Sequence, residues 1–166
     1  MNIRDEKRTD EEAIFTMTAA AFENMPYSRQ TEPYIVNALR AAGALTISLV
    51  AEIDGEVVGH VAFSPVEISD GSRNWYTLGP VSVAPAFQNR GVGGALIIEG
   101  LAKLKSLGAE GCLLVGDPAY YTRFNFRNDH DMHIEGVPPE NLLVLPFHGR
   151  TPKGAVTIHE GFFATS

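Results

Sequence analysis

The first forty residues combine an amphipathic spacing with polar breaks, which is typical of two helices. Thr9 followed three residues later by Glu12 has the sequence of a capping box, so we expect a helix to begin there. Its apolar positions recur at helical spacing: Ile14, Met17 and Ala21. After a polar break at residues 23–30, Pro33 marks the first turn of a second helix and Gly43 its end.

From residue 45 onward, runs of apolar and β-branched residues separated by turn sequences predict strands. Three consecutive segments are expected to form an antiparallel meander: residues 45–53, 56–66 and 75–83. Asp54-Gly55 is the expected tight turn of its first hairpin. Other strands are expected at residues 2–4, 111–115, 141–145 and 155–162, and later helices at residues 95–107 and 119–124. No repeat or linker interrupts this pattern, so we expect residues 1–166 to form a single domain.

The segment from Leu78 to Leu96 joins the end of a strand, a glycine-rich loop and the start of a helix. Its loop reads Gln88-Asn89-Arg90-Gly91-Val92-Gly93-Gly94. At such a helix start, backbone N–H groups point the same way and carry about half a positive charge, while glycines let an anion approach. The segment therefore predicts a site for a phosphate-bearing ligand.

The residues that the loop lacks narrow the class of phosphate ligand. No Gly-Lys-Ser/Thr sequence follows the glycines, so the segment is not a P-loop. Leu96 stands where a dinucleotide fingerprint needs its third glycine, which argues against that class as well.

Gly79-Pro80 falls in the middle of the expected strand at residues 75–83, where proline removes a hydrogen-bond donor from the ladder. We therefore predict a β-bulge there, which would splay this strand from the one at residues 111–115 and open a cleft between them. The alternative is that Gly79-Pro80 ends one strand and begins another.

A second informative segment, residues 116–126, reads Gly-Asp-Pro-Ala-Tyr-Tyr-Thr-Arg-Phe-Asn-Phe. Together with Gln-x-x-Gly-x-Gly behind Val-x-Pro, it resembles the two signatures of the Gcn5-related N-acetyltransferase (GNAT) superfamily, closest to the YhbS-like acetyltransferases. Asn125 stands where the superfamily usually has glycine. We expect the same turn, because Asn tolerates a positive φ better than most residues.

The resemblance implies an α/β (α+β) fold, with a mixed, mostly antiparallel central sheet, helices on both faces and a V-shaped splay between strands 4 and 5. In the superfamily, the pantetheine arm of acetyl-CoA lies in that splay and pairs with strand backbone. Gln88 is expected to close the loop by side-chain hydrogen bonds, and Arg90 to face solvent beside a phosphate. Side chains in place of Gly91, Gly93 or Gly94 are expected to block the pyrophosphate. The acetyl-CoA site implied for this chain consists of Val81, Ser82, Val83, Gln88, Asn89, Arg90, Gly91, Val92, Gly93, Gly94, Asp117 and Tyr120.

Tyr121 takes the place of the tyrosine often assigned as general acid in the superfamily, so the resemblance implies that role for it. Acetyl transfer from a thioester to an amine requires a neutral amine, stabilisation of the carbonyl oxygen and protonation of the leaving thiolate. A phenol with a pKa near ~10 is protonated at neutral pH and donates to a thiolate whose conjugate acid has a pKa near ~8.5. A backbone N–H around Val81 would polarise the carbonyl. The alternative for Tyr120 and Tyr121 is aromatic packing.

No residue is assigned as the general base, and a water chain to a more distant group is equally consistent with the sequence. The strand at residues 75–83 carries no carboxylate or histidine, and the candidates elsewhere are Glu52, His60, Glu67 and Asp117. A strand histidine such as His60 is more often a half-buried packing residue, and Asp117 is equally suited to cap the next helix. We expect no metal site, because His130 and His133 have no third ligand nearby and are expected at the surface.

Composition restricts the remaining classes of protein. The chain has 166 residues, of which 45% are hydrophobic and 20% charged, as is ordinary for a globular protein. A net charge of −7 without a cluster of Lys or Arg argues against nucleic acid as a partner. The single cysteine, Cys112, excludes an internal disulfide, and its apolar neighbours predict a buried thiol. No segment has the pattern of a signal peptide or membrane span, so we expect a cytoplasmic protein without a membrane partner.

The leading hypothesis is an N-acetyltransferase that transfers an acetyl group from acetyl-CoA to a primary amine by direct transfer in a ternary complex. The acceptor is expected to be a small molecule or a peptide, and a homodimer is common among members of the superfamily. A non-catalytic acyl-CoA-binding or sensing module is the alternative, motivated by the unassigned base. A domain that binds another phosphate ligand is the third hypothesis.

Overall fold

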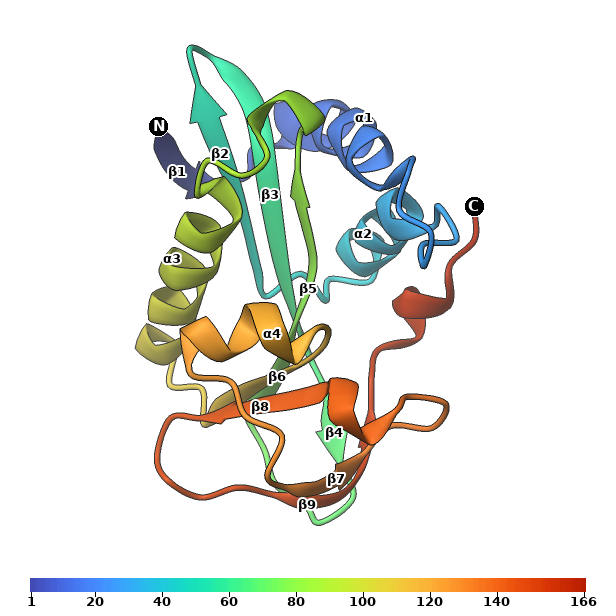
Figure 1. Ribbon diagram of the computed structural model, residues 1–166, viewed down its shortest axis with the longest axis vertical. Helices are drawn as coiled ribbons and strands as arrows, with labels where there is room; N and C mark the ends of the chain where they lie inside the picture. The colour runs from blue at the N-terminus through green and yellow to red at the C-terminus, as the bar shows by residue number, and fades with distance from the viewer.

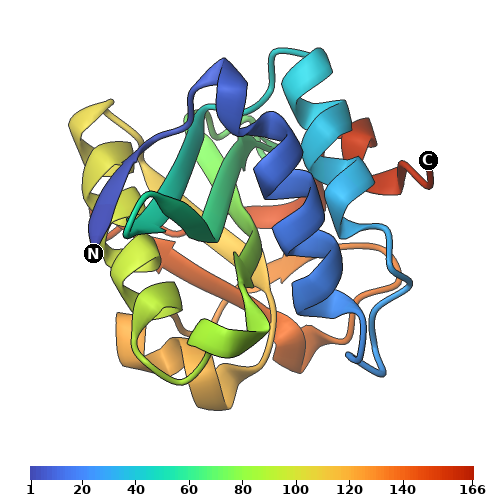
Figure 2. The same cartoon turned by 90° about the horizontal axis from the view of Figure 1, so that it is seen from above.

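The computed structural model describes residues 1–166, in which a six-stranded sheet lies between helices on its two faces (Figures 1 and 2). The strand order is β1-β2-β3-β5-β6-β8, and every neighbouring pair is antiparallel except β5 and β6, which are parallel. The strands are Asn2–Asp5 (β1), Ile47–Ile53 (β2), Glu56–Pro65 (β3), Trp75–Val83 (β5), Gly111–Val115 (β6) and Leu142–Pro146 (β8). The expected mixed, mostly antiparallel α/β (α+β) fold is thereby confirmed.

Two helices cover one face of the sheet and a third covers the other (Figures 1 and 2). The first pair is α1 (Glu11–Phe22) and α2 (Glu32–Ala41), and the third is α3 (Val92–Ser106). The short helix α4 (Pro118–Tyr121) follows β6. Single 3₁₀ turns complete the helical elements: Arg8–Asp10 (η1), Pro85–Phe87 (η2), Thr122–Phe124 (η3), Pro139–Asn141 (η4) and Glu160–Phe163 (η5). None of the helices combines the length and apolar character needed to cross a membrane.

The start of α1 differs from the capping box expected at Thr9 and Glu12. Thr9 lies inside the turn η1, and Asp10 occupies the N-cap position of α1. The Lys7 N–H donates to Asp10 Oδ2 over 2.6 Å, and Arg4 Nη1 donates to the same oxygen over 2.7 Å. Arg4 holds the Asp10 carboxylate beside the Lys7 N–H. The bond from a backbone N–H to a carboxylate three residues later therefore joins Lys7 to Asp10, rather than Thr9 to Glu12.

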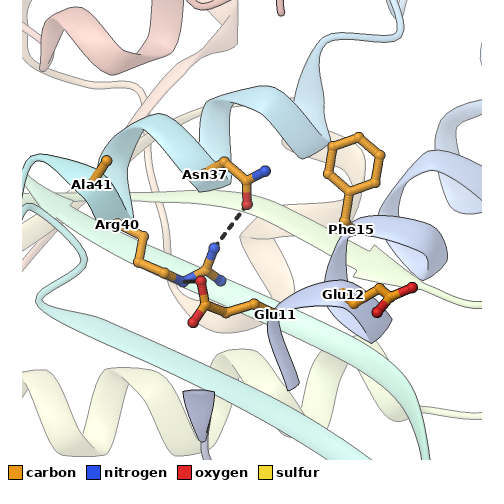
Figure 3. A pocket seen from close by; sticks show the side chains of 6 residues that line it. All are labelled: Glu11, Glu12, Phe15, Asn37, Arg40 and Ala41. Carbon is orange, nitrogen blue, oxygen red and sulfur yellow. Dashed lines mark hydrogen bonds and ion pairs between the residues drawn. The ribbon is translucent and has the colours of Figure 1, made fainter. Parts of the chain in front are cut away.

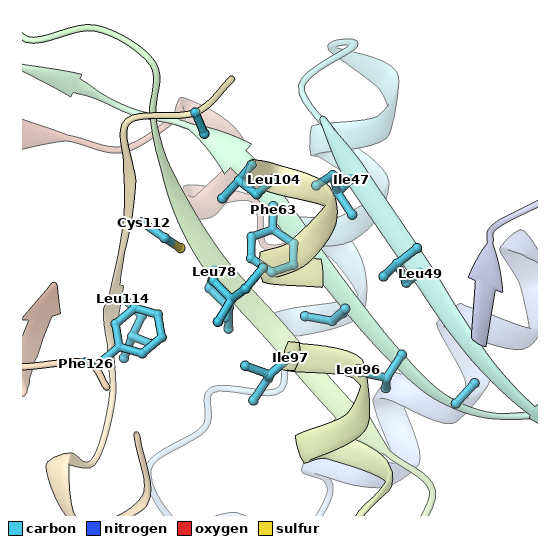
Figure 4. Close-up of a cluster of buried hydrophobic side chains, with 14 of the residues drawn as sticks. Ile47, Leu49, Phe63, Leu78, Leu96, Ile97, Leu104, Cys112, Leu114 and Phe126 are labelled. Atoms are coloured by element: carbon cyan, nitrogen blue, oxygen red, sulfur yellow. The ribbon is translucent and has the colours of Figure 1, made fainter. Parts of the chain in front are cut away.

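The largest hydrophobic core lies between α3 and the sheet (Figure 4). Alternate residues of β2 point to opposite faces: Ile47 and Leu49 join this core, whereas Val50 packs with Ile14 of α1 and Val36 of α2. The buried thiol of Cys112 belongs to the α3 side, as expected for an apolar strand.

Two glycines allow α3 to lie close to β3. A Cβ at Gly59 on β3 would lie 2.9 Å from both Val92 Cγ1 and Leu96 Cδ1, closer than real contacts allow. From the other side, a Cβ at Gly100 on α3 would overlap the ring of Phe63, which is completely buried. The absence of a side chain at Gly100 therefore lets α3 pack directly on Phe63.

The predicted bulge is present in β5. Val61 pairs with Val81 and Phe63 with Leu78, so Gly79 and Pro80 together lie opposite the single residue Ala62. The peptide bond between Gly79 and Pro80 is cis. β5 therefore continues through Gly79-Pro80 as one strand, and the alternative of two separate strands is wrong.

The predicted splay is also present, between β5 and β6. The two strands pair only from Trp75 opposite Gly111 to Thr77 opposite Leu113. β6 pairs with β8 along all five of its residues, so it follows β8 away from β5. The splay separates the fifth and sixth strands in the numbering of Figure 1, because the two-residue strand β4 (Glu67–Ile68) precedes β5.

The C-terminal third departs most from the expected pattern. A second sheet has the order β4-β9-β7, with β7 at Asp131–His133 and β9 at Lys153–Thr157. The expected strand at residues 155–162 is therefore wrong beyond Thr157, and β7 was not expected. The His159 ring accepts a hydrogen bond of 2.9 Å from the Gly161 N–H, which turns the chain into η5 instead of continuing the strand.

Candidate functional site

The glycine-rich loop lies at the N-terminus of α3. Gln88 Nε2 donates to Val83 O over 3.0 Å, which confirms the expected closure of the loop by this side chain. Asn89 (φ 62°) and Gly91 (φ 83°) are both left-handed and turn the chain into the helix. The first N–H groups of a helix have no partners within it, so the amides at residues 92–94 are available to an anion.

The three loop glycines differ in their surroundings. No heavy atom lies within 4 Å of a Cβ placed at Gly91, whose left-handed φ is what favours glycine there. At Gly93 a Cβ would lie 3.6 Å from Tyr120 Oη, and at Gly94 it would lie 3.6 Å from Phe124 Cζ. The Cβ direction of Gly94 thus points to the η3 turn, at an ordinary contact distance from the Phe124 ring.

Arg90 is exposed, as expected, and its Cζ lies 5.4 Å from the centre of the Phe87 ring. Phe87 belongs to η2, directly before the loop. The ring therefore attracts the guanidinium, and Arg90 adds a positive charge to the segment that precedes the start of α3.

The amides of β5 divide into two sets. The Ala84 N–H donates to Val58 O on β3 over 2.8 Å. Since amides of successive strand residues point to opposite sides, the amide of Ser82 also faces β3, whereas those of Val81 and Val83 face the side from which β6 has diverged. The bond from Gln88 to Val83 O agrees with this direction.

Ser82 is therefore not brought to the splay, although the sequence included it in the acetyl-CoA site. Its side chain is 2% exposed, and its carbonyl oxygen lies 3.4 Å from a Cβ placed at Gly59 on β3. The strand alternation turns its neighbours toward the splay and Ser82 away from it. We remove Ser82 from the site for this reason.

Tyr120 and Tyr121 occupy different places on α4. Tyr120 Oη lies at the first turn of α3, beside Gly93, and the Arg123 Cζ lies 4.4 Å from the Tyr120 ring centre. The Tyr121 ring packs edge-on against Tyr120, with centroids 4.9 Å apart, and against Phe126 at 6.3 Å. The packing role left open for both rings is thus present, and Tyr120 also presents its hydroxyl to the loop.

The Tyr121 phenol is held in its neutral form. Burial, together with the nearby hydroxyls of Tyr120 and Tyr27, raises the pKa of Tyr121 to about 12. Tyr27 belongs to the segment between α1 and α2 and is 79% exposed. With this raised pKa, Tyr121 remains a proton donor throughout the neutral pH range.

Two further expectations at this segment are confirmed. Asp117 Oδ1 accepts a hydrogen bond of 2.9 Å from the Ala119 N–H and caps α4. Asn125 has a φ of 72°, the left-handed turn expected where the superfamily usually has glycine.

The candidate bases lie away from the splay or are held by other groups. Glu52 accepts from Arg4 Nη2 over 2.9 Å, Glu67 lies on β4, and Asp117 is engaged as a helix cap. His60 is completely buried on β3, and burial lowers its pKa to about 4. A neutral imidazole with so low a pKa is a poor acceptor for the proton of an ammonium group.

His60 belongs to a polar chain that the sequence pattern did not reveal. His60 Nε2 lies 2.8 Å from Ser48 Oγ, and Ser48 Oγ contacts the Glu6 carboxylate. Arg40 on α2 binds that carboxylate through Nε (2.8 Å) and Nη2 (2.9 Å). Although burial raises the pKa of Glu6, hydrogen bonds from Arg40 and Ser48 outweigh it and hold the pKa below its usual value. The available signal was a serine inside the apolar strand β2.

His130 is half-buried and bonds to two backbone groups. Its Nδ1 accepts from the Met132 N–H over 3.0 Å, and its Nε2 lies 2.7 Å from Leu142 O. Both ring nitrogens are therefore occupied, while His133 is exposed on β7.

A separate hollow of about 500 Å³ lies between α1 and α2 (Figure 3). Arg40 crosses it, donating to Asn37 Oδ1 over 2.8 Å and lying 3.8 Å from Glu11 Oε1. The hollow contains none of the loop glycines, tyrosines or β5 amides described above. We therefore place the candidate site at the splay and the glycine loop.

Comparison with known proteins agrees with this geometry. The chain matches the model of the acetyltransferase (GNAT) family over residues 12–136. In sequence it is 36% identical over 171 residues to the uncharacterized N-acetyltransferase YhbS of Escherichia coli K12, with 98% of each chain covered.

Two solved structures are similar over nearly the whole chain. A GNAT family acetyltransferase from Brucella melitensis, in complex with acetyl-CoA, has a TM-score of 0.87 at 49% identity, with 97% of each chain covered. Escherichia coli YhbS, in complex with CoA, has a TM-score of 0.88 at 31% identity in the structural alignment, with 99% of this chain and 93% of YhbS covered. With its splayed sheet, its glycine loop and these similarities, the chain belongs to the acetyltransferase (GNAT) family.

Proposed function

We propose that this protein transfers an acetyl group from acetyl-CoA to a primary amine, directly and within a ternary complex. The observation that carries the proposal is the end of β5–β6 pairing at Thr77, which leaves the outward amides of Val81 and Val83 free of a strand partner on that side. Relatives whose structures contain acetyl-CoA or CoA support the same ligand for this chain.

Each part of the site has a distinct task in this proposal. Amides at residues 92–94 and the Arg90 guanidinium bind the pyrophosphate, because both carry positive charge at the helix start. The amide of Val83 pairs with the arm of the co-substrate in the place of a continuing strand. The N–H of Val81 stabilises the carbonyl oxygen as it gains negative charge.

The reaction forms a nitrogen–carbon bond and breaks the carbon–sulfur bond of the thioester. Tyr121 donates its proton to the departing thiolate, and its raised pKa keeps that proton available at neutral pH. The amine attacks as the free base, and the one proton that its nitrogen then loses returns through water to the Tyr121 phenolate, which restores the phenol. The acceptor in this proposal is a small-molecule or peptide amine.

Calorimetry with acetyl-CoA, followed by a thiol-release assay over a panel of amines, tests the proposal. Binding together with amine-dependent release of CoA is the expected result. Binding without turnover of any amine would instead favour the acyl-CoA-binding module. No binding at millimolar acetyl-CoA, with thermal stabilisation by another phosphate ligand, would refute both.

A further inference from the structure

Two directly opposed residues of β3 and β5 each carry a buried polar atom without a hydrogen-bond partner. His60 and Ser82 are directly opposed in the register of the two strands. The His60 side chain is 0% exposed and Ser82 is 2% exposed, and neither His60 Nδ1 nor Ser82 Oγ has a partner. Nearly all buried side-chain polar atoms in proteins are hydrogen-bonded, so this pair requires a physical explanation.

The face of the sheet on which they lie is known from their neighbours. His60 also pairs in register with Val50 on β2, and Val50 packs with Ile14 of α1. The two unpartnered atoms therefore lie in the layer between the sheet and α1. Thr18 of α1, also 0% exposed, brings a third unpartnered atom, its Oγ1, into this layer.

The tautomer of His60 is fixed by the polar chain behind it. The Glu6 carboxylate only accepts hydrogen bonds, so the single hydrogen of the Ser48 hydroxyl is directed to Glu6. Ser48 Oγ must then accept from His60, which places the ring hydrogen on Nε2. Nδ1 consequently carries a bare lone pair that points away from Ser48 and can only accept.

We propose that a water molecule is bound permanently between His60 Nδ1 and Ser82 Oγ. Side chains of directly opposed strand residues have Cβ atoms about 5 Å apart, so one water beside both side chains can form a hydrogen bond with each of them. Water donates to the lone pair of Nδ1 and accepts from the Ser82 hydroxyl. Its second hydrogen is available to Thr18 Oγ1, which gives the three hydrogen bonds typical of a buried water.

This water would extend the polar chain from Arg40 through Glu6, Ser48 and His60 to the back of β5. Ser82 lies between Val81 and Val83, whose amides face the splay. The water therefore holds β5 in place on the α1 face of the sheet. It does so at the residues of β5 that have no strand partner on the β6 side. The proposal does not depend on which reaction the splay supports.

A high-resolution crystal structure of the full chain is the direct test. We expect a density peak at hydrogen-bond distance from both His60 Nδ1 and Ser82 Oγ. A Ser82 hydroxyl bonded to a backbone carbonyl, with no peak beside His60 Nδ1, would overturn the proposal.

Two solution measurements test it independently. Ser82→Ala is expected to lower the Tm by about 2–4 °C, the shift that corresponds to one lost hydrogen bond in a chain of this size. Ser64→Ala is the matched control, because Ser64 is a fully buried serine on β3 that is opposed by Thr77 on β5 rather than by a histidine. Deleting a hydroxyl that truly lacks a partner leaves the Tm unchanged or raises it, so that result for Ser82→Ala would contradict the proposal.

The ¹⁵N chemical shifts of the His60 ring provide the second measurement. We expect a protonated Nε2 and an unprotonated, hydrogen-bonded Nδ1, whose shift moves toward that of a free lone pair in Ser82→Ala. A hydrogen on Nδ1, or an Nδ1 shift that is the same in both proteins, is the contrary outcome.

Discussion

Gln88 Nε2 donates a hydrogen bond of 3.0 Å to Val83 O and so joins the glycine loop to the last residue of β5. The loop amides and the outward amides of β5 are thereby held in one frame. In the proposed function these two groups of amides contact the pyrophosphate and the pantetheine arm of the same molecule, so their relative position matters for its affinity.

Replacing Gln88 by alanine is expected to weaken acetyl-CoA binding about fivefold, since one neutral hydrogen bond contributes about 1 kcal/mol. Calorimetry measures the change. Gln30→Ala is the matched control, because Gln30 Nε2 makes the same kind of bond to Phe22 O away from the loop. Equal losses of affinity in the two variants would argue against a specific role for the Gln88 tether.

Tyr121→Phe is expected to lower kcat by about 10²-fold or more, the range for general acid–base catalysis, with acetyl-CoA affinity nearly unchanged. Tyr120→Phe is the neighbouring control and is expected to change KM for acetyl-CoA rather than kcat, because its hydroxyl lies at the start of α3. Steady-state kinetics and calorimetry separate the two effects. A collapse of affinity in Tyr121→Phe would remove it as the general acid.

His60 makes stability depend on pH. Its pKa is about 4 in the folded protein and about 6.5 when unfolded, so the unfolded chain binds the proton more tightly. The free energy of unfolding is therefore highest above pH 6.5 and falls as the pH decreases toward 4. Between pH 7 and pH 5 the expected loss from His60 is about 2 kcal/mol.

Denaturant titrations at pH 7 and pH 5 measure this loss, and His60→Gln is expected to remove most of it. Glu6 does not interfere, because its lowered pKa acts only below its unfolded value of about 4.5. NMR of the unmodified protein gives a separate readout. A His60 ring that titrates near pH 6.5 in the folded state would show that His60 does not cause the loss of stability.

Gly100→Ala is expected to destabilise the protein by about 1–3 kcal/mol, although alanine is favoured over glycine in helices by about 1 kcal/mol. The added methyl group would overlap the Phe63 ring, which is 0% exposed and cannot move aside freely. Gly94→Ala, on the same helix, places its Cβ at an ordinary 3.6 Å from Phe124 and is expected to cause no loss. Chemical denaturation of the two variants checks the contrast in sign.

Cys112 is expected to resist thiol reagents in the native protein. The thiol is completely buried, and burial raises its pKa above the usual value, so little thiolate forms. Labelling with a chromogenic disulfide is expected only after unfolding in guanidinium. The folded protein therefore adds little background signal to a thiol-release assay. Rapid labelling of the folded chain would contradict the burial of this strand.

The sequence was informative where a residue type has a special backbone requirement. Gly79-Pro80 predicted the bulge because proline cannot donate within a ladder, and Asn125 predicted a left-handed turn. The Asp54-Gly55 hairpin was found for the same reason, since both residues have a positive φ. These signals are local and do not depend on distant contacts.

The features that were missed depend on contacts between distant segments. Asp10 replaces Thr9 at the start of α1 because Arg4 reaches its carboxylate from β1. Ser82 faces away from the splay because of the strand alternation beyond the bulge. That His60 lies opposite Ser82 follows only from the register of β3 and β5. No short sequence pattern contains this information.

β5 and β6 are joined by only three residue pairs, between Trp75–Thr77 and Gly111–Leu113. This short pairing is the only strand contact between two parts of the sheet, β1-β2-β3-β5 and β6-β8. A ligand whose arm forms hydrogen bonds with the unpaired edge of β5 would lie between these two parts of the sheet and connect them. We expect the boundary between β5 and β6 to become more rigid when acetyl-CoA binds. Slower amide hydrogen exchange in β5 and β6 would then report occupancy of the site without any assay of turnover.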